Sequence, residues 1–187
     1  MKASLFLFGI AVLLLIGNSA VVNAQGPVAS EEYKLLKQEE GNWTATIKLF
    51  YGPTGPYDQP QVATAEETNQ MIGPFFLTSD FKANFGGVPF TGHGVFGYDK
   101  AAKKYTGMWV DSFAATPTKM LGTYDEATKT ITYETTAMGM SGPTKGKNVV
   151  VYKDADSRQM TMYMQLPEQE EMTKMMELEY VRKKAMK

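Results

Sequence analysis

The stretch that decides the fold is Gly92–Phe113, GHGVFGYDKAAKKYTGMWVDSF. Aromatic and apolar residues alternate with small or polar ones on both sides of a charged break, DKAAK, which is typical of two β-strands joined by a tight turn. Side chains alternate between the faces of a strand, so pairing Tyr98 with Tyr105 puts Trp109 and Asp111 on the face of both tyrosines. We expect this aromatic face to be the interior of the fold.

The same register places glycines opposite large rings. Gly94 faces Trp109, and Gly107 faces Phe96. A strand glycine leaves a hole in the layer of side chains, and a ring on the neighbouring strand can cover that hole. The opposite face mixes apolar and polar residues: His93, Val95, Met108, Val110 and Ser112. A shift of one residue in the register would exchange the two faces.

The pattern of strand, turn and strand recurs along most of the chain. Besides the central hairpin, the predicted strands are Trp43–Tyr51, Gln61–Met71, Phe75–Phe85, Thr118–Tyr124, Thr130–Ala137, Val149–Lys153, Arg158–Leu166 and Met176–Lys183. A short helix is predicted before them, with Ser30 as its N-cap and Gly41 at its end. About ten strands with mostly short connections favour an up-and-down antiparallel barrel over a sandwich, because closure of a meander removes its exposed edges.

Closure of the barrel would bring the two ends of the chain together. Gly41-Asn42-Trp43 stands at the start of the first strand, and Arg182 stands near the end of the last. This arrangement resembles the lipocalin-like (calycin) barrels, in which the tryptophan of a Gly-x-Trp motif packs under an arginine from the final strand. The resemblance implies that the Arg182 guanidinium lies against the Trp43 ring and seals one end of the barrel by a cation–π contact.

Four segments together are similar to a bacterial family catalogued as domain of unknown function 1579. They are Gly41–Trp43, Gly97–Asp99, Trp109–Ser112 and Lys174–Lys183, in this order along the chain. The resemblance covers nearly all of the chain after its first segment and implies a lipocalin-like barrel. It brings no catalytic residues, so it implies no activity.

Residues 1–24 are predicted to be a secretory signal peptide, followed by a single barrel domain over residues 25–187. Lys2 precedes an uncharged run, Leu5–Ile16, and Val22-Asn23-Ala24 provides small residues at the cleavage positions. The run has 12 residues, fewer than the roughly 20 that span a bilayer, so no stable membrane span is expected. We therefore expect an exported protein, periplasmic or secreted, whose stability without any cysteine depends on core packing.

Composition and motifs argue against several function classes. The chain has 19 basic and 20 acidic residues, so it lacks the basic excess that would attract nucleic acid. The Gly-x-Gly-x-x-Gly match at Gly92–Gly97 precedes a turn and a strand, whereas a dinucleotide site requires a helix there. One histidine and no cysteine make a multi-histidine metal site or a hydrolytic triad difficult to build.

No cofactor is expected, although two alternatives stay open. His93 is interpreted as a hydrogen-bonded strand histidine, and a single histidine could also be the axial ligand of a haem inside a barrel. Met160, Met162 and Met164 share one face of a strand and are interpreted as core or pocket lining. Their thioethers could instead bind Cu(I), which is a soft ion.

The function that we expect is binding of a small apolar or amphipathic molecule inside the barrel. The candidate ligand-binding residues are Trp43, Tyr98, Trp109, Asp111, Glu134 and Arg182. Asp111 has two interpretations: a hydrogen-bonding staple for the neighbouring turn, or a polar group of the pocket that anchors a ligand or acts as a general acid or base.

Two other functions remain open from the sequence. One is a hydrolase or isomerase that uses Asp111 or Glu134 in the pocket. The other is a protein without a ligand that acts through its outer surface or as an oligomer.

Overall fold

The computed structural model describes residues 30–52, 54–139 and 142–184. The expected signal peptide, residues 1–24, and the expected start of the mature chain at Gln25 lie outside these ranges. None of the helices among the described residues has the length and apolar character that crossing a membrane requires.

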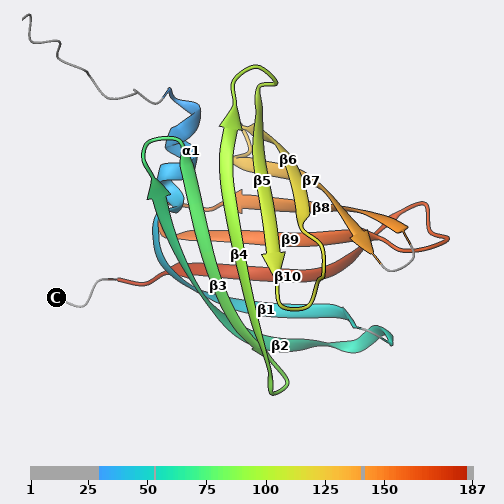
Figure 1. The fold of residues 1–187 in the computed structure, drawn as a ribbon. Coiled ribbons are helices and arrows are strands. Elements are labelled where there is room, and N and C mark those ends of the chain that lie inside the picture. The colour runs from blue at the N-terminus through green and yellow to red at the C-terminus, as the bar shows by residue number, and fades with distance from the viewer. Residues whose placement is uncertain (1–29, 53, 140–141, 185–187) are drawn as a thin grey trace, which may run out of the picture.

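Ten antiparallel strands form a closed barrel in which each strand pairs with its neighbours in sequence and β1 pairs with β10 (Figure 1). The strands are β1 Gly41–Gly52, β2 Gly55–Ile72, β3 Phe76–Phe85, β4 Val88–Asp99, β5 Lys104–Asp111, β6 Thr118–Asp125, β7 Thr130–Gly139, β8 Gly142–Tyr152, β9 Ser157–Gln165 and β10 Met172–Arg182. One helix, α1 Glu32–Glu39, precedes them within the described residues. The predicted up-and-down barrel with a short N-terminal helix is confirmed.

The bounds of several elements differ from the prediction. The N-cap of α1 is Glu31 rather than Ser30, whose carbonyl accepts a hydrogen bond from the Tyr33 amide at 3.1 Å. Strand β8 begins at Gly142, well before the predicted start, and β10 begins at Met172. The added residues are polar or glycine, yet they extend the strands because their backbone N–H and C=O groups pair with those of long neighbouring strands. This pairing depends on the tertiary structure, so the local sequence pattern does not predict it.

The central hairpin has the predicted register and the predicted inner face. Tyr98 lies opposite Tyr105, and Gly94 lies opposite Trp109. Tyr105 is buried, whereas Val95 on the other face is exposed. A Cβ at Gly92 would lie 2.1 Å from Cζ2 of Trp109, so the indole fills the space that the missing side chain leaves.

The first and last strands meet as the calycin resemblance implies. Trp43 lies directly opposite Arg182, whose guanidinium carbon is 4.1 Å from the centre of the Trp43 ring. Gly41 has a φ of +126°, and a Cβ there would lie 2.7 Å from Nη1 of Arg182. The glycine of the Gly-x-Trp motif is therefore needed both for its backbone conformation and for the space that the arginine occupies.

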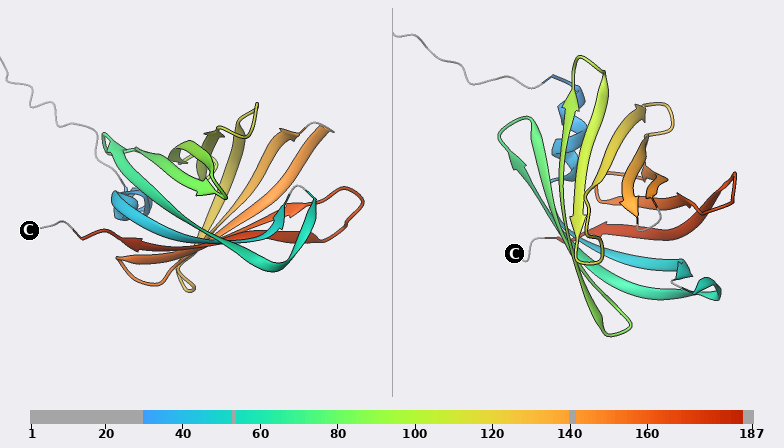
Figure 2. Two further views of the ribbon diagram at one scale, coloured as in Figure 1. Left: turned by 90° about the horizontal axis from the view of Figure 1, so that it is seen from below. Right: turned by 45° about the vertical axis from the view of Figure 1, so that its right-hand side comes forward.

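Helix α1 closes one end of the barrel. The Tyr33 ring packs edge-on against the rings of Phe75 and Tyr98, and its hydroxyl donates a hydrogen bond to the carbonyl of Tyr98 at 3.1 Å. The Tyr105 hydroxyl donates to the carbonyl of Glu32 at 2.9 Å. The connections β1–β2 and β9–β10 lie at the other end, away from the helix (Figure 2). We call this other end the mouth.

The pairing of β10 with β1 buries one face of β10 in the core, and this burial can be tested by measuring stability. Leu178 is 2% exposed and Val181, on the same strand, is 56% exposed. Leu178→Ala should lower the free energy of unfolding by about 2–5 kcal/mol, because it removes buried contacts and leaves a cavity in the core. Val181→Ala should change the free energy of unfolding by roughly 0.5 kcal/mol or less. Urea denaturation followed by circular dichroism measures both, and equal losses would contradict the observed closure.

Candidate functional site

The barrel contains a cavity of about 850 Å³ that reaches from α1 to the mouth. Its size falls within the range of roughly 300–1,000 Å³ that is usual for small-molecule sites. Aromatic and aliphatic side chains form most of its wall, among them Leu77, Phe81, Phe85, Phe90, Phe96, Trp109, Phe113 and Leu178. Phe113 and Val88 at the mouth are 60% and 53% exposed, so apolar surface continues from the cavity to the solvent.

Methionines form a second part of the wall, on β9 and β10. Met160, Met162 and Met164 line the cavity, which confirms their interpretation as pocket lining. A register shift between Lys174 and Met176 makes a β-bulge in β10, and two successive residues, Met175 and Met176, line the cavity there. Unbranched thioether side chains adapt their shape to a ligand at little cost.

The floor of the cavity, next to α1, is polar and is built around Arg158. Its guanidinium carbon lies 4.2 Å from the centre of the Trp43 ring and 4.1 Å from the centre of the Tyr180 ring. Its Nη1 forms an ion pair with Oε2 of Glu39 at 2.8 Å, and its Nη2 contacts Oε1 of Glu67. Arg158 is 5% exposed, so this ion pair is almost completely removed from water.

Asn69 completes the floor. Its Nδ2 donates to Oε1 of Glu67 at 2.6 Å and to the backbone carbonyl of Glu39 at 3.1 Å. These two bonds fix the orientation of the amide, because both partners are acceptors. The Asn69 Oδ1 atom is buried and has no hydrogen-bond partner among the described residues.

Burial raises the pKa of the Glu39 carboxyl above its ordinary value, because desolvation outweighs the attraction of the Arg158 guanidinium. Desolvation, together with the nearby Glu39 carboxylate, also raises the pKa of the Tyr152 and Tyr133 hydroxyls. Both tyrosines therefore remain neutral, and the charges of the floor are those of Glu39, Glu67 and Arg158.

The polar floor was not predicted from the sequence, although part of its signal is present there. Arg158 is two residues before Met160 on one strand, so it shares the face of the methionines that we expected to line a pocket. Glu67 and Asn69 likewise share the inward face of β2 with the buried Ala65. A charged residue on an inward face is an unusual feature that the alternation of the strand could have revealed.

Trp109 and Asp111 line the cavity near the mouth, as expected. The Trp109 indole nitrogen donates to Oδ2 of Asp111 at 3.0 Å. The backbone amides of Phe113 and Ala114 donate to its Oδ1 at 2.8 and 3.0 Å. Both carboxylate oxygens of Asp111 therefore accept hydrogen bonds that hold the Trp109 ring and the following turn in place. This agrees with the first interpretation of Asp111, as a residue that stabilises the neighbouring turn.

Three expected ligand-binding residues lie at the α1 end, outside the lining of the cavity. Trp43 is 2% exposed and lies between the guanidinium groups of Arg158 and Arg182. Arg182 forms an ion pair with Asp156 at 3.0 Å, on the far side of the Trp43 ring from the cavity. Tyr98 packs against α1. These three residues seal the closed end of the barrel, and their positions do not place them in contact with the cavity.

The expectation that Glu134 lies in the pocket was wrong. Its neighbour Tyr133 is the residue that points inward and is buried, and alternation along β7 therefore turns Glu134 outward, where it is exposed. His93 is also on the outer face, and its Nδ1 lies 2.7 Å from Oδ1 of Asp80. A histidine in this position is a strand residue and cannot ligate a haem inside the barrel.

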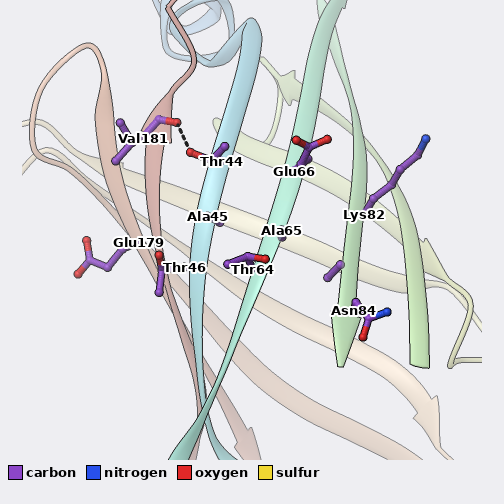
Figure 3. A pocket seen from close by; sticks show the side chains of 11 residues that line it. Thr44, Ala45, Thr46, Thr64, Ala65, Glu66, Lys82, Asn84, Glu179 and Val181 are labelled. Carbon is purple, nitrogen blue, oxygen red and sulfur yellow. Dashed lines mark hydrogen bonds between the residues drawn. The ribbon is translucent and has the colours of Figure 1, made fainter. Parts of the chain in front are cut away.

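A second hollow, of about 440 Å³, lies on the outer surface of β1, β2, β3 and β10 (Figure 3). Outward-facing polar side chains surround it, including Thr44, Thr64, Glu66 and Lys82. It is separated from the barrel interior by the sheet. No cluster of histidine, aspartate and glutamate residues suited to a metal ion occurs here or elsewhere among the described residues.

Comparison with known proteins identifies the family. A family model described as "Protein of unknown function (DUF1579)" matches residues 28–182. The chain belongs to the DUF1579 family. The resemblance seen in the four sequence segments is thereby confirmed, and the family description assigns no activity. No curated protein matches the chain.

Two solved structures share the fold of this DUF1579 protein at low sequence identity. Rv2717c from M. tuberculosis is 14% identical, with a TM-score of 0.61, and the match covers 84% of this chain and 100% of that one. The S-type phycobiliprotein lyase CPES from Guillardia theta is 9% identical, with a TM-score of 0.55, and the match covers 82% of this chain and 93% of that one. At these identities the similarity shows the architecture of the barrel.

The ion pair at the floor leads to a test with a rescue variant. Arg158→Met should lower the free energy of unfolding by about 3–5 kcal/mol, because it leaves two buried carboxylates without a counter-charge. Adding Glu39→Gln and Glu67→Gln to the same chain should recover a large part of that loss, since the uncompensated charges are removed. Urea denaturation measures the three chains, and an additive loss in the triple variant would contradict the charge argument.

The raised pKa of Glu39 leads to a test by pH. A carboxyl whose pKa is higher in the folded state binds its proton more tightly there, so its contribution to stability falls as the pH rises above the ordinary value of 4.5. The free energy of unfolding of the wild type minus that of Glu39→Gln should therefore decrease with rising pH, up to the folded-state pKa. Denaturation curves over a pH series measure this difference, which would instead increase if Arg158 held the pKa below the ordinary value.

Proposed function

We propose that this protein is an exported carrier or sensor that binds one small apolar or amphipathic molecule inside its barrel. The observation that carries the proposal is the cavity of about 850 Å³, with apolar walls and a few polar groups at its floor. Such a combination is typical of sites that bury most of a small ligand and orient it through a few polar contacts. The apolar rim at Phe113 and Val88 offers a path for an apolar molecule.

Export is the part of the proposal that rests on the sequence. The support is Leu5–Ile16, an apolar run of 12 residues shortly after Lys2, and the small residues before Gln25. If the signal peptide is removed as expected, the intact mass of the protein from its own cells corresponds to a chain that begins at Gln25. A mass that still includes residues 1–24 would contradict export by cleavage.

A specific observation favours a second candidate function, an interaction surface for another protein. The outer faces of β4, β5 and β6 expose Val95, Met108, Val110 and Leu121, and Val95 lies directly opposite Met108. Contiguous exposed apolar residues are typical of such surfaces. Light scattering coupled to size-exclusion chromatography distinguishes a monomer from an oligomer that covers this patch. The enzyme alternative has less support, because Glu134 is outside the barrel and Asp111 holds a turn.

Ligand binding can be tested with two adjacent threonines on β7. Thr135 lines the cavity, whereas Thr136 is exposed on the outer face. Thr135→Trp should fill part of the cavity and weaken binding of the neutral apolar probe N-phenyl-1-naphthylamine by about tenfold or more. Thr136→Trp should leave the affinity within about twofold. The fluorescence of the probe measures both affinities.

The outcomes of this experiment are distinct. A wild type that does not bind the probe, or two variants that bind it equally, would contradict a binding site inside the barrel. Thermal unfolding by circular dichroism shows whether each variant keeps its fold, so that a loss of binding in Thr135→Trp is not the result of unfolding.

A further inference from the structure

The polar and apolar parts of the cavity are separated along its length. The charged residues that line it are Glu39, Glu67, Asp111, Lys145 and Arg158. Three of them, Glu39, Glu67 and Arg158, gather at the floor, and Asp111 and Lys145 lie towards the mouth. The wall between the floor and the mouth is formed mainly by aromatic, aliphatic and methionine side chains, with a few neutral polar groups such as Thr135 and Asn148. An amphipathic molecule in this cavity therefore places its polar head at the floor and its apolar tail along the wall, because the opposite orientation presses the apolar tail against the buried charged groups of the floor.

The charge at the floor decides which head groups fit. Two carboxylates and one guanidinium leave one negative charge in excess when both are ionised, and no excess when Glu39 is protonated. Neither state offers the free positive charge that a carboxylate head would need, since Arg158 already contacts Glu39 and Glu67. A second guanidinium, that of Arg182, is beyond the Trp43 ring and is paired with Asp156.

The Asn69 amide and the end of α1 favour a donor as well. The Asn69 Oδ1 atom is a buried acceptor without a partner among the described residues, and both hydrogens of its Nδ2 are already used. Helix α1 ends at Glu39, so the negative end of the helix dipole faces the same region. The charges, the amide oxygen and the dipole therefore all favour a donor or a cation over an anion.

We propose that the barrel selects an amphipathic ligand whose head group donates hydrogen bonds, with an alkylammonium preferred over an alcohol and an alcohol preferred over a carboxylate. The proposal rests on the proposed function and specifies the chemical class of its ligand. Glu39 receives the head group, because it is the carboxylate at the floor that is least buried, with 12% of its side chain exposed against 8% for Glu67.

The test is a competition series with matched tails. Dodecylammonium, dodecanol and dodecanoate are each used at neutral pH to displace N-phenyl-1-naphthylamine from the wild-type protein, the two ions below their micelle concentrations and dodecanol below its solubility limit. We expect dodecylammonium to bind about tenfold or more tightly than dodecanoate, with dodecanol in between. Tightest binding of dodecanoate, or equal binding of all three, would overturn the proposal and leave the proposed function intact. If neither the probe nor any of the three binds, the proposed function fails, and the present proposal fails with it.

A pair of variants tests the role of Glu39. Glu39→Gln should remove most of the preference for dodecylammonium over dodecanol, because it removes the carboxylate that pairs with the ammonium group. Glu134→Gln, which changes the same side chain on the outer face, should retain the wild-type preference. An unchanged preference in Glu39→Gln would overturn the assignment of the head-group position. The wild-type series decides the ligand class even if Glu39→Gln does not fold.

Discussion

The structure depends on the stacking of the Trp43 ring between two guanidinium groups, those of Arg158 and Arg182. Arg182 comes from the last strand and also donates hydrogen bonds to the carbonyls of Gln38 and Glu40 at the end of α1. The indole nitrogen of Trp43 donates to the carbonyl of Glu39 at 2.9 Å. The first strand, the last strand and the helix are thus joined at a single residue, which closes the barrel at one end and leaves the other end for a mouth.

Trp43 links the closure of the barrel to the buried charges inside it. One face of the Trp43 ring contacts Arg182 at the outside of the floor, and the other contacts Arg158 at the inside. Burial of Arg158 requires counter-charges, which Glu39 and Glu67 supply. A polar floor beneath apolar walls is therefore a consequence of how the barrel is sealed, and it gives the cavity a direction along which an amphipathic molecule can be oriented.

Period-two alternation predicted the strands, the register of the central hairpin and its inner face, because these follow from local pairs such as Gly94 and Trp109. The contact between Trp43 and Arg182 was expected from the Gly-x-Trp motif. The polar floor was not, because Glu39, Glu67 and Arg158 are far apart in sequence and only closure brings them together. Glu134 was assigned to the wrong face because its strand carries polar and apolar residues on both faces, so that alternation alone did not decide between Tyr133 and Glu134.

The barrel encloses a cavity of about 850 Å³, in which we propose that one small molecule binds above the polar floor. Native mass spectrometry of the protein purified from its own cells, before and after addition of dodecylammonium, tests this claim most directly. We expect a chain that carries one non-covalent molecule, either retained from the cell or supplied as dodecylammonium, and that loses it on collisional activation. A chain that keeps its bare mass under both conditions while remaining folded would contradict ligand binding inside the barrel.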